Sequence, residues 1–104
     1  RHYLNPETVK QFTTRFPGSS RRGIGFDMKE TDPKQTANMS ALAGPNTFGH
    51  LGFTGICAWA DPDKDLIFIF LSNRTYPIME NNKLMNGDYR PKLQGVAYRA
   101  IVKQ

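Results

Sequence analysis

Residues 48–55, Phe-Gly-His-Leu-Gly-Phe-Thr-Gly, are the part of this sequence best suited to chemistry. The imidazole of His50 can accept or donate a proton near neutral pH. Gly49, Gly52 and Gly55 allow another backbone or a ligand to approach the chain closely. The segment is therefore a candidate site. The structural alternative is a surface or partly buried histidine that hydrogen-bonds to a neighbour.

Cys57 is the single cysteine, so it cannot form a disulfide within the chain. It lies in an apolar, strand-like stretch, where a free cysteine is usually a small buried hydrophobe. Cys57 has no neighbouring His or Lys in the sequence that could activate its thiol. The sequence has two histidines and no Cys/His cluster, so it predicts no metal site.

The N-terminal part predicts a helix and a strand. Asn5 is a suitable N-cap, and Pro6 fits the first helical position. The apolar face of this helix is predicted to comprise Val9, Phe12 and Phe16. Residues 23–29 alternate as a strand, and residues 30–46 are rich in turn formers and predict a long loop.

The remaining sequence predicts two further strands and a helix. Residues 47–60 are expected to form one strand, a turn follows at 61–64, and residues 65–72 form an antiparallel neighbour. The unbroken apolar run in 65–72 predicts burial on both faces of the sheet. Residues 90–104 predict a helix. Its expected apolar face comprises Leu93, Val96, Ala97, Ala100 and Ile101.

These elements predict an α+β fold in which about three antiparallel strands are flanked by an N-terminal and a C-terminal helix. A length of 104 residues corresponds to one domain or part of one. The formal net charge is +5, but the basic residues are scattered rather than gathered in a stripe, which argues against a nucleic-acid partner. No apolar run is long enough to span a membrane.

Three stretches together resemble a known family: residues 48–55, Trp59-Ala60-Asp61-Pro62, and Ser72-Asn73-Arg74-Thr75-Tyr76-Pro77. From about Leu4 onward, the chain resembles the last third of the penicillin-recognising serine hydrolases. These include class C β-lactamases, related esterases and DD-peptidases. The resemblance implies that residues 1–104 are a partial β-lactamase-like domain, whose sheet is covered on its other face by a helical domain encoded upstream. It also implies a bacterial periplasmic or envelope location and chemistry without metal or cofactor.

In that family a Lys-Thr-Gly or His-Thr-Gly triplet lines the active site, and here the triplet reads His50-Leu51-Gly52. By resemblance, His50 takes the basic role and Gly52 lets the substrate backbone approach. The Phe53 N–H contributes to the oxyanion hole. Leu51 departs from the pattern because it has no hydroxyl to bind a substrate carboxylate. A leucine there suits an ester or amide that lacks this carboxylate.

A second departure follows the last predicted strand. Class C enzymes carry Asn-Lys-x-Tyr-Pro there, and then an Asn and an Arg that help to hold the substrate carboxylate. The position after Pro77 is Ile78 in this chain. We interpret Asn73 and Arg74 as the end of the strand and a surface ion pair.

The family's nucleophile is the serine of a Ser-x-x-Lys motif, in which the lysine accepts the hydroxyl proton. None of the four serines has a lysine three residues later. Those positions are Arg22, Gly23, Ala43 and Thr75. Tyr3-Leu4-Asn5 spells the family's Tyr-x-Asn motif, but we interpret the match as coincidental because Asn5 is expected to cap a helix.

The leading hypothesis is a C-terminal fragment of a serine hydrolase that is inert alone. Its expected partners are the missing N-terminal part, or a second copy bound through the sheet, and a small amide or ester substrate in the parent. The alternative is a non-catalytic remnant or binding module of the same fold, which Leu51 and Ile78 favour. A small basic nucleic-acid-binding domain ranks last because basic and aromatic residues are not interleaved.

Overall fold

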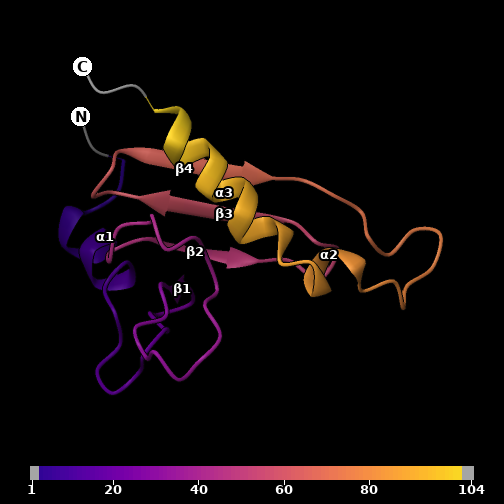
Figure 1. Cartoon of the computed structure of the whole chain (residues 1–104). Helices are drawn as coiled ribbons and strands as arrows, with labels where there is room; N and C mark the ends of the chain where they lie inside the picture. The colour runs from indigo at the N-terminus through magenta and orange to yellow at the C-terminus, as the bar shows by residue number, and fades with distance from the viewer. Residues whose placement is uncertain (1–2, 102–104) are drawn as a thin grey trace.

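The computed structural model describes residues 3–101, and in this part of the chain it contains three helices and one four-stranded antiparallel sheet (Figure 1). The strands are β1 (Asp27–Met28), β2 (Phe48–Leu51), β3 (Cys57–Asp61) and β4 (Leu66–Phe70), in the order β1-β2-β3-β4. The helices are α1 (Pro6–Phe12), α2 (Lys83–Asn86) and α3 (Tyr89–Ala100). The predicted α+β class is confirmed, with four strands rather than about three.

The prediction of one strand over residues 47–60 is wrong, because a turn divides this segment into β2 and β3. The Gly52 N–H donates to the Ile56 carbonyl at 2.8 Å, and the Gly55 N–H donates to the Gly52 carbonyl at 3.0 Å. Gly55 has a φ of 101°, which side chains disfavour. Gly52 and Gly55 were interpreted as points of close approach within one strand, whereas they are the two ends of this turn.

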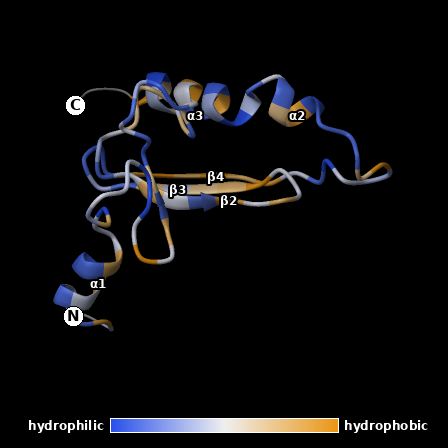
Figure 2. Cartoon of the chain, turned by 90° about the horizontal axis from the view of Figure 1, so that it is seen from below, coloured by the Kyte–Doolittle hydropathy of each residue, from blue (hydrophilic) through white to orange (hydrophobic). Residues whose placement is uncertain are grey.

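The main core lies between the sheet and α3. Cys57 and Trp59 of β3 are only 1% and 2% exposed, and they pack with Met39 and Ala43. Leu51, Phe68, Phe70 and Tyr98 are partly buried against this cluster. Figure 2 shows α2 and α3 together on one side of the sheet, with α1 lying apart from them. The predicted burial of Cys57 is confirmed.

The other face of the sheet is open over β3 and β4. Ile67, Ile69 and Leu71 are 73%, 60% and 74% exposed. Ala58 pairs with both His50 and Ile69, so these three side chains share this face. The prediction that residues 65–72 are buried on both faces is therefore wrong for the described chain. An exposed aliphatic row of this kind is typical of an interface.

The helix α1 begins as predicted, but it does not bury its apolar face. The Asn5 side chain accepts hydrogen bonds from the N–H groups of Glu7 and Thr8, at 2.8 and 3.4 Å. Val9 and Phe12 are 42% and 43% exposed, and Phe16, which lies beyond the end of α1, is 55% exposed. The local capping chemistry was readable from sequence, whereas the packing of the helix was not.

The helix α3 packs through a face different from the predicted one. Its buried residues are Gln94 and Gly95, whereas Leu93 and Val96 are exposed. The Gln94 side chain turns inward because its Oε1 accepts a hydrogen bond from the Ser40 N–H at 2.9 Å. The end of the predicted helix, 102–104, lies outside the described residues.

Hydrogen bonds fix residues 30–46, which contain no helix or strand. The Asn38 side chain donates to the Met28 carbonyl at 2.8 Å and accepts from the Glu30 N–H at 3.0 Å. At the first strand, only Asp27 and Met28 of the predicted residues 23–29 are paired in β1. Within residues 3–101, no helix has the length and apolar character needed to cross a membrane.

Candidate functional site

The triplet His50-Leu51-Gly52 lies at the end of β2, where the sheet has a free edge. The short strand β1 pairs only with Phe48 and Gly49. In an antiparallel strand, successive residues direct their backbone groups to opposite edges. The Gly52 N–H bonds toward β3, so the Leu51 N–H and carbonyl face the outer edge. Within residues 3–101 the Leu51 N–H has no backbone partner at this edge, whereas the Leu51 carbonyl contacts the His50 side chain, so the edge offers one free donor to a ligand.

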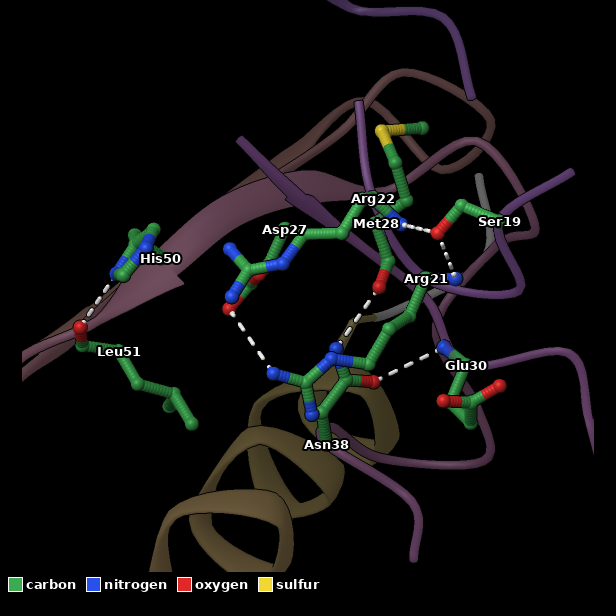
Figure 3. A network of polar contacts seen from close by, with 9 residues as sticks. All are labelled: Ser19, Arg21, Arg22, Asp27, Met28, Glu30, Asn38, His50 and Leu51. Atoms are coloured by element: carbon green, nitrogen blue, oxygen red, sulfur yellow. Dashed lines mark hydrogen bonds and ion pairs between the residues drawn. The ribbon is translucent and has the colours of Figure 1, made fainter. Parts of the chain in front are cut away.

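His50 is exposed on the open face of the sheet, and its imidazole is oriented by the backbone. Its Nδ1 lies 2.6 Å from the Leu51 carbonyl oxygen (Figure 3). Because a carbonyl can only accept, Nδ1 carries the proton in this contact. In the neutral imidazole Nε2 is then the unprotonated nitrogen, able to accept a proton. The geometry thus suits His50 both as a surface histidine and as a basic group on the triplet strand.

The Leu51 side chain is half-buried on the opposite face, against the core of α3 and β3. It also lines a cavity of about 130 Å³ between the sheet edge and the C-terminal helices. The other residues around this cavity are Ala37, Asn38, Leu84, Met85, Asp88, Tyr89, Arg90 and Pro91. Small-molecule sites are usually about 300–1,000 Å³. The cavity is therefore too small to be a complete site for a drug-sized substrate.

Gly52 has a packing reason to be glycine. A Cβ at this position would lie 2.2 Å from Cγ1 of Ile56. Glycine is thus required by the hairpin itself, whether or not a substrate approaches. The sequence could not separate these two explanations, because both require a residue without a side chain.

Phe53 follows the triplet in a turn, and the residue is 69% exposed. The guanidinium carbon of Arg74 lies 4.7 Å from the centre of this ring. Within residues 3–101, the Phe53 N–H donates to no backbone or side-chain acceptor. The triplet segment thus ends in a free backbone donor, which is the kind of group that an oxyanion hole uses.

Two arginines beside the turn were not found as site residues from the sequence. Arg74 was interpreted as part of a surface ion pair, but its Nη1 donates to the carbonyls of Met79 and Asn81, at 3.1 and 3.2 Å. Arg90 reaches from α3 to the backbone of the hairpin. Their partners are carbonyl groups, which carry no sequence signature. Asn73 accepts a hydrogen bond from the Thr75 hydroxyl at 2.8 Å, in line with its role at the end of the strand.

The titratable groups near the core are structural. Burial raises the pKa of the Cys57 thiol, which disfavours the nucleophilic thiolate. Burial also raises the pKa of Tyr98, whose hydroxyl donates to the Asp61 carboxylate. In Asp61, burial acts to raise the pKa, but hydrogen bonds from Tyr98 and three backbone N–H groups outweigh it and lower the pKa. Within residues 3–101, no three His, Cys, Asp or Glu side chains gather as metal ligands would.

A larger cavity, of about 410 Å³, lies between α1 and the segment that follows it. It contains none of the triplet residues, and its lining includes Lys10, Arg15, Phe16 and Ile24. Its size exceeds that of the cavity beside Leu51, but it has no arrangement of nucleophile and base. We therefore place the candidate site at the edge of β2.

Comparisons with known proteins identify the family to which the chain belongs. The sequence model of the family described as Beta-lactamase matches residues 1–85. The chain is 32% identical over 102 residues to a protein of Escherichia coli (strain K12) named "Putative D-alanyl-D-alanine carboxypeptidase". This match covers 97% of the chain and 23% of that protein. No solved structure gives a significant match.

Proteins of the same name from Salmonella paratyphi B and Salmonella newport are each 33% identical over 81 residues. Each of these matches covers 78% of the chain and 18% of the relative. The chain thus spans less than a quarter of the length of these curated relatives. Most of each relative has no counterpart in the 104 residues.

Proposed function

Because the chain belongs to the β-lactamase family, we propose that it is the C-terminal, triplet-bearing segment of a serine acyl hydrolase whose nucleophile lies outside these 104 residues. The observation that carries the proposal is the family match over residues 1–85 in a sequence without Ser-x-x-Lys. The parent attacks an amide or ester carbonyl with its serine, forms an acyl-enzyme and releases the acid by hydrolysis.

The segment supplies the strand against which the substrate lies. His50 is the basic group beside the reacting centre, supported by its oriented imidazole with Nε2 as the proton acceptor. Gly52 permits the close approach of the substrate, and the unpaired N–H of Phe53 donates to the oxyanion. The free edge of β2 supports this arrangement, because an extended substrate can add to it as a strand.

The proposed substrate is a small amide or ester of the acyl class. The E. coli and Salmonella relatives carry the name of a D-alanyl-D-alanine carboxypeptidase, and a substrate of that kind ends in a carboxylate. Leu51 offers no hydroxyl to such a group. We therefore propose that the parent prefers acyl substrates without a carboxylate at this position.

The partner of the segment is proposed to be the remainder of the same polypeptide. The exposed row of Ile67, Ile69 and Leu71 supports the proposal that another part of the polypeptide packs on the open face. The E. coli relative is more than four times as long as the matched region, so a longer polypeptide of this kind could provide that part. When the chain is alone, a second copy is expected to occupy this face instead, because exposed aliphatic rows associate.

The proposal predicts that the purified chain is inert. Incubation with a chromogenic cephalosporin and with a short nitrophenyl ester should give no saturable turnover above a surface-histidine background. Turnover that survives His50→Ala and disappears on mutation of one of Ser19, Ser20, Ser40 or Ser72 would refute the claim that the nucleophile lies elsewhere.

A second candidate function is a non-catalytic binding module of the same fold. The half-buried Leu51 favours it, because the triplet position that carries a hydroxyl in the family contributes here to the core. A longer polypeptide that contains this chain and a Ser-x-x-Lys separates the two functions. Acyl hydrolysis that depends on the motif's serine supports the enzyme, and its absence in a folded protein supports the binding module.

A further inference from the structure

The peptide group that joins Gly52 to Phe53 is held from one side by Arg90. The Nη1 atom of Arg90 lies 3.4 Å from the Gly52 carbonyl oxygen and 3.0 Å from the Ile56 carbonyl oxygen. These two carbonyls stand on either side of the β2–β3 turn. Arg90 is the second residue of α3, so a single guanidinium nitrogen connects the start of this helix to both ends of the turn.

The orientation of the Phe53 N–H follows from the orientation of the Gly52 carbonyl. Both groups belong to one planar, trans peptide unit, in which the C=O and the N–H point in opposite directions. The Gly52 carbonyl is bonded on the inner side by Arg90 and by the Gly55 N–H at 3.0 Å. The Phe53 N–H must therefore point outward, toward the free edge of β2.

The charge of Arg90 acts on the same peptide unit. A cation beside the carbonyl oxygen draws electron density toward that oxygen, and hydrogen bonds in series polarise one another. The N–H at the other end of the unit then becomes a stronger donor to a negatively charged acceptor. Because Arg90 is half-buried beside the turn, solvent screens this effect less than it would screen a fully exposed charge.

We infer that Arg90 is a positioning residue that orients and polarises the Phe53 N–H as the oxyanion donor. This inference rests on the proposed function, in which the Phe53 N–H faces the reacting carbonyl. It assigns to α3 a part in catalysis through the hairpin backbone rather than through contact with the substrate.

Arg74 provides an internal comparison. Its guanidinium stacks on the Phe53 ring, and its backbone N–H donates to the Thr54 carbonyl at 2.9 Å. These contacts hold the side chain and the far part of the turn, but they do not touch the Gly52–Phe53 peptide unit. Loss of the Arg74 side chain should therefore affect the oxyanion donor less than loss of the Arg90 side chain.

The test uses the full-length parent that carries the Ser-x-x-Lys. Arg90→Gln should lower kcat about tenfold and weaken binding of a boronic acid transition-state analogue by a similar factor, while KM stays within about twofold. Arg90→Lys retains a donor but not the planar fork, so an intermediate loss of about threefold is expected in both quantities. Arg99→Gln, with the same charge change on the same helix, should leave both unchanged.

Two variants of Phe53 separate this inference from the proposed function. Proline is accommodated at the second position of a β-turn, so Phe53→Pro removes the N–H while the hairpin persists. It should lower kcat by about 10²–10³, whereas Phe53→Ala keeps the N–H and should have a small effect. An unchanged kcat in Phe53→Pro would refute the site assignment itself.

If Phe53→Pro lowers kcat and folded Arg90→Gln does not, the inference about Arg90 is wrong and the proposed function stands. If Arg90→Gln fails to fold, Arg90→Lys decides the question. A folded Arg90→Lys with unchanged kcat and unchanged affinity for the boronic acid overturns the inference.

Discussion

The two faces of the sheet differ in how completely the rest of the chain covers their side chains. On the face toward α3, Cys57 and Trp59 are almost fully buried, and the turn after the triplet is fastened by backbone and arginine contacts. On the opposite face, Ile67, Ile69 and Leu71 are mostly exposed. The candidate site strand is therefore supported on the covered face, while the face that carries His50 is exposed in the described chain. This difference is what a segment of a larger family fold is expected to have.

The largest effect on stability should follow from a substitution on the buried face of the sheet. Trp59→Ala removes a side chain that is 2% exposed, and it should lower the free energy of unfolding by about 3–5 kcal/mol. This is comparable with the whole stability of a small domain. Denaturant unfolding followed by circular dichroism should show loss of the cooperative transition. The matched control is Ile69→Ala on the open face, with a change within about 0.5 kcal/mol. Equal losses in the two variants would contradict the comparison.

The next effect concerns the buried carboxylate that joins β3 to α3. Asp61 accepts from the Tyr98 hydroxyl, from the Gly44 N–H at 2.8 Å and from the Asp63 N–H at 2.9 Å. Asp61→Asn should lower the free energy of unfolding by about 1.5–3 kcal/mol, since hydrogen bonds to a charge are lost. The control is Asp65→Asn, because Asp65 is exposed and asparagine tolerates its φ of 54°.

The pH dependence of stability gives a second measurement on Asp61. Hydrogen bonds hold its folded-state pKa below the ordinary value of 3.8. Its contribution is therefore present above pH 3.8 and is lost as the pH falls through the folded-state pKa. Acid titration of the wild type should show this loss, and Asp61→Asn should show a shallower decline. Identical acid titrations would mean that the carboxylate does not stabilise the fold.

Leu51→Thr tests whether this residue contributes to substrate recognition, to core packing, or to both. In an active parent, a hydroxyl that reaches a substrate carboxylate should improve kcat/KM for carboxylate-bearing substrates by about 1.5–3 kcal/mol of transition-state stabilisation. The same change removes apolar contacts from the core and should lower stability by about 1 kcal/mol. Comparison of matched substrates with and without the carboxylate measures the first effect. Equal changes for both substrates would place the side chain outside the recognition site.

The smallest effect on stability, and the most visible effect on association, should come from charge on the open face. The isolated chain should associate as its concentration rises, because the exposed aliphatic row remains in water. Ile67→Lys with Ile69→Lys should abolish this association and leave the unfolding free energy nearly unchanged. Sedimentation velocity across a concentration series measures the difference. A wild-type chain that remains a compact monomer at high micromolar concentration would contradict the open-face account.

The parts of the fold that were predictable depended on local chemistry. The Asn5 cap and the burial of Cys57 could be read from neighbouring residues. The pairing of β3 with β4 followed from their short connection. The turn at residues 52–56 was missed because Gly52 and Gly55 were interpreted as points of close approach within a strand, whereas the hairpin and its packing require them.

The parts that were not predictable depended on distant partners. The packed face of α3 is set by Gln94, whose partner Ser40 lies 54 positions away, so the apolar stripe of Leu93 and Val96 was misleading. Arg90 contacts carbonyls 34 and 38 positions away, and its sequence context does not distinguish it from a surface arginine. The triplet was recognisable by its residue types, but the support behind it was visible only in three dimensions.

The central claim is that these residues supply a site strand and not the nucleophile. The most direct test is to label the isolated chain and the full-length parent with a β-lactam or a fluorophosphonate, and to locate the acylated residue by mass spectrometry. The account predicts no adduct on the isolated chain and a single adduct in the parent, on a serine outside residues 1–104. An adduct on Ser19, Ser20, Ser40 or Ser72 would contradict it.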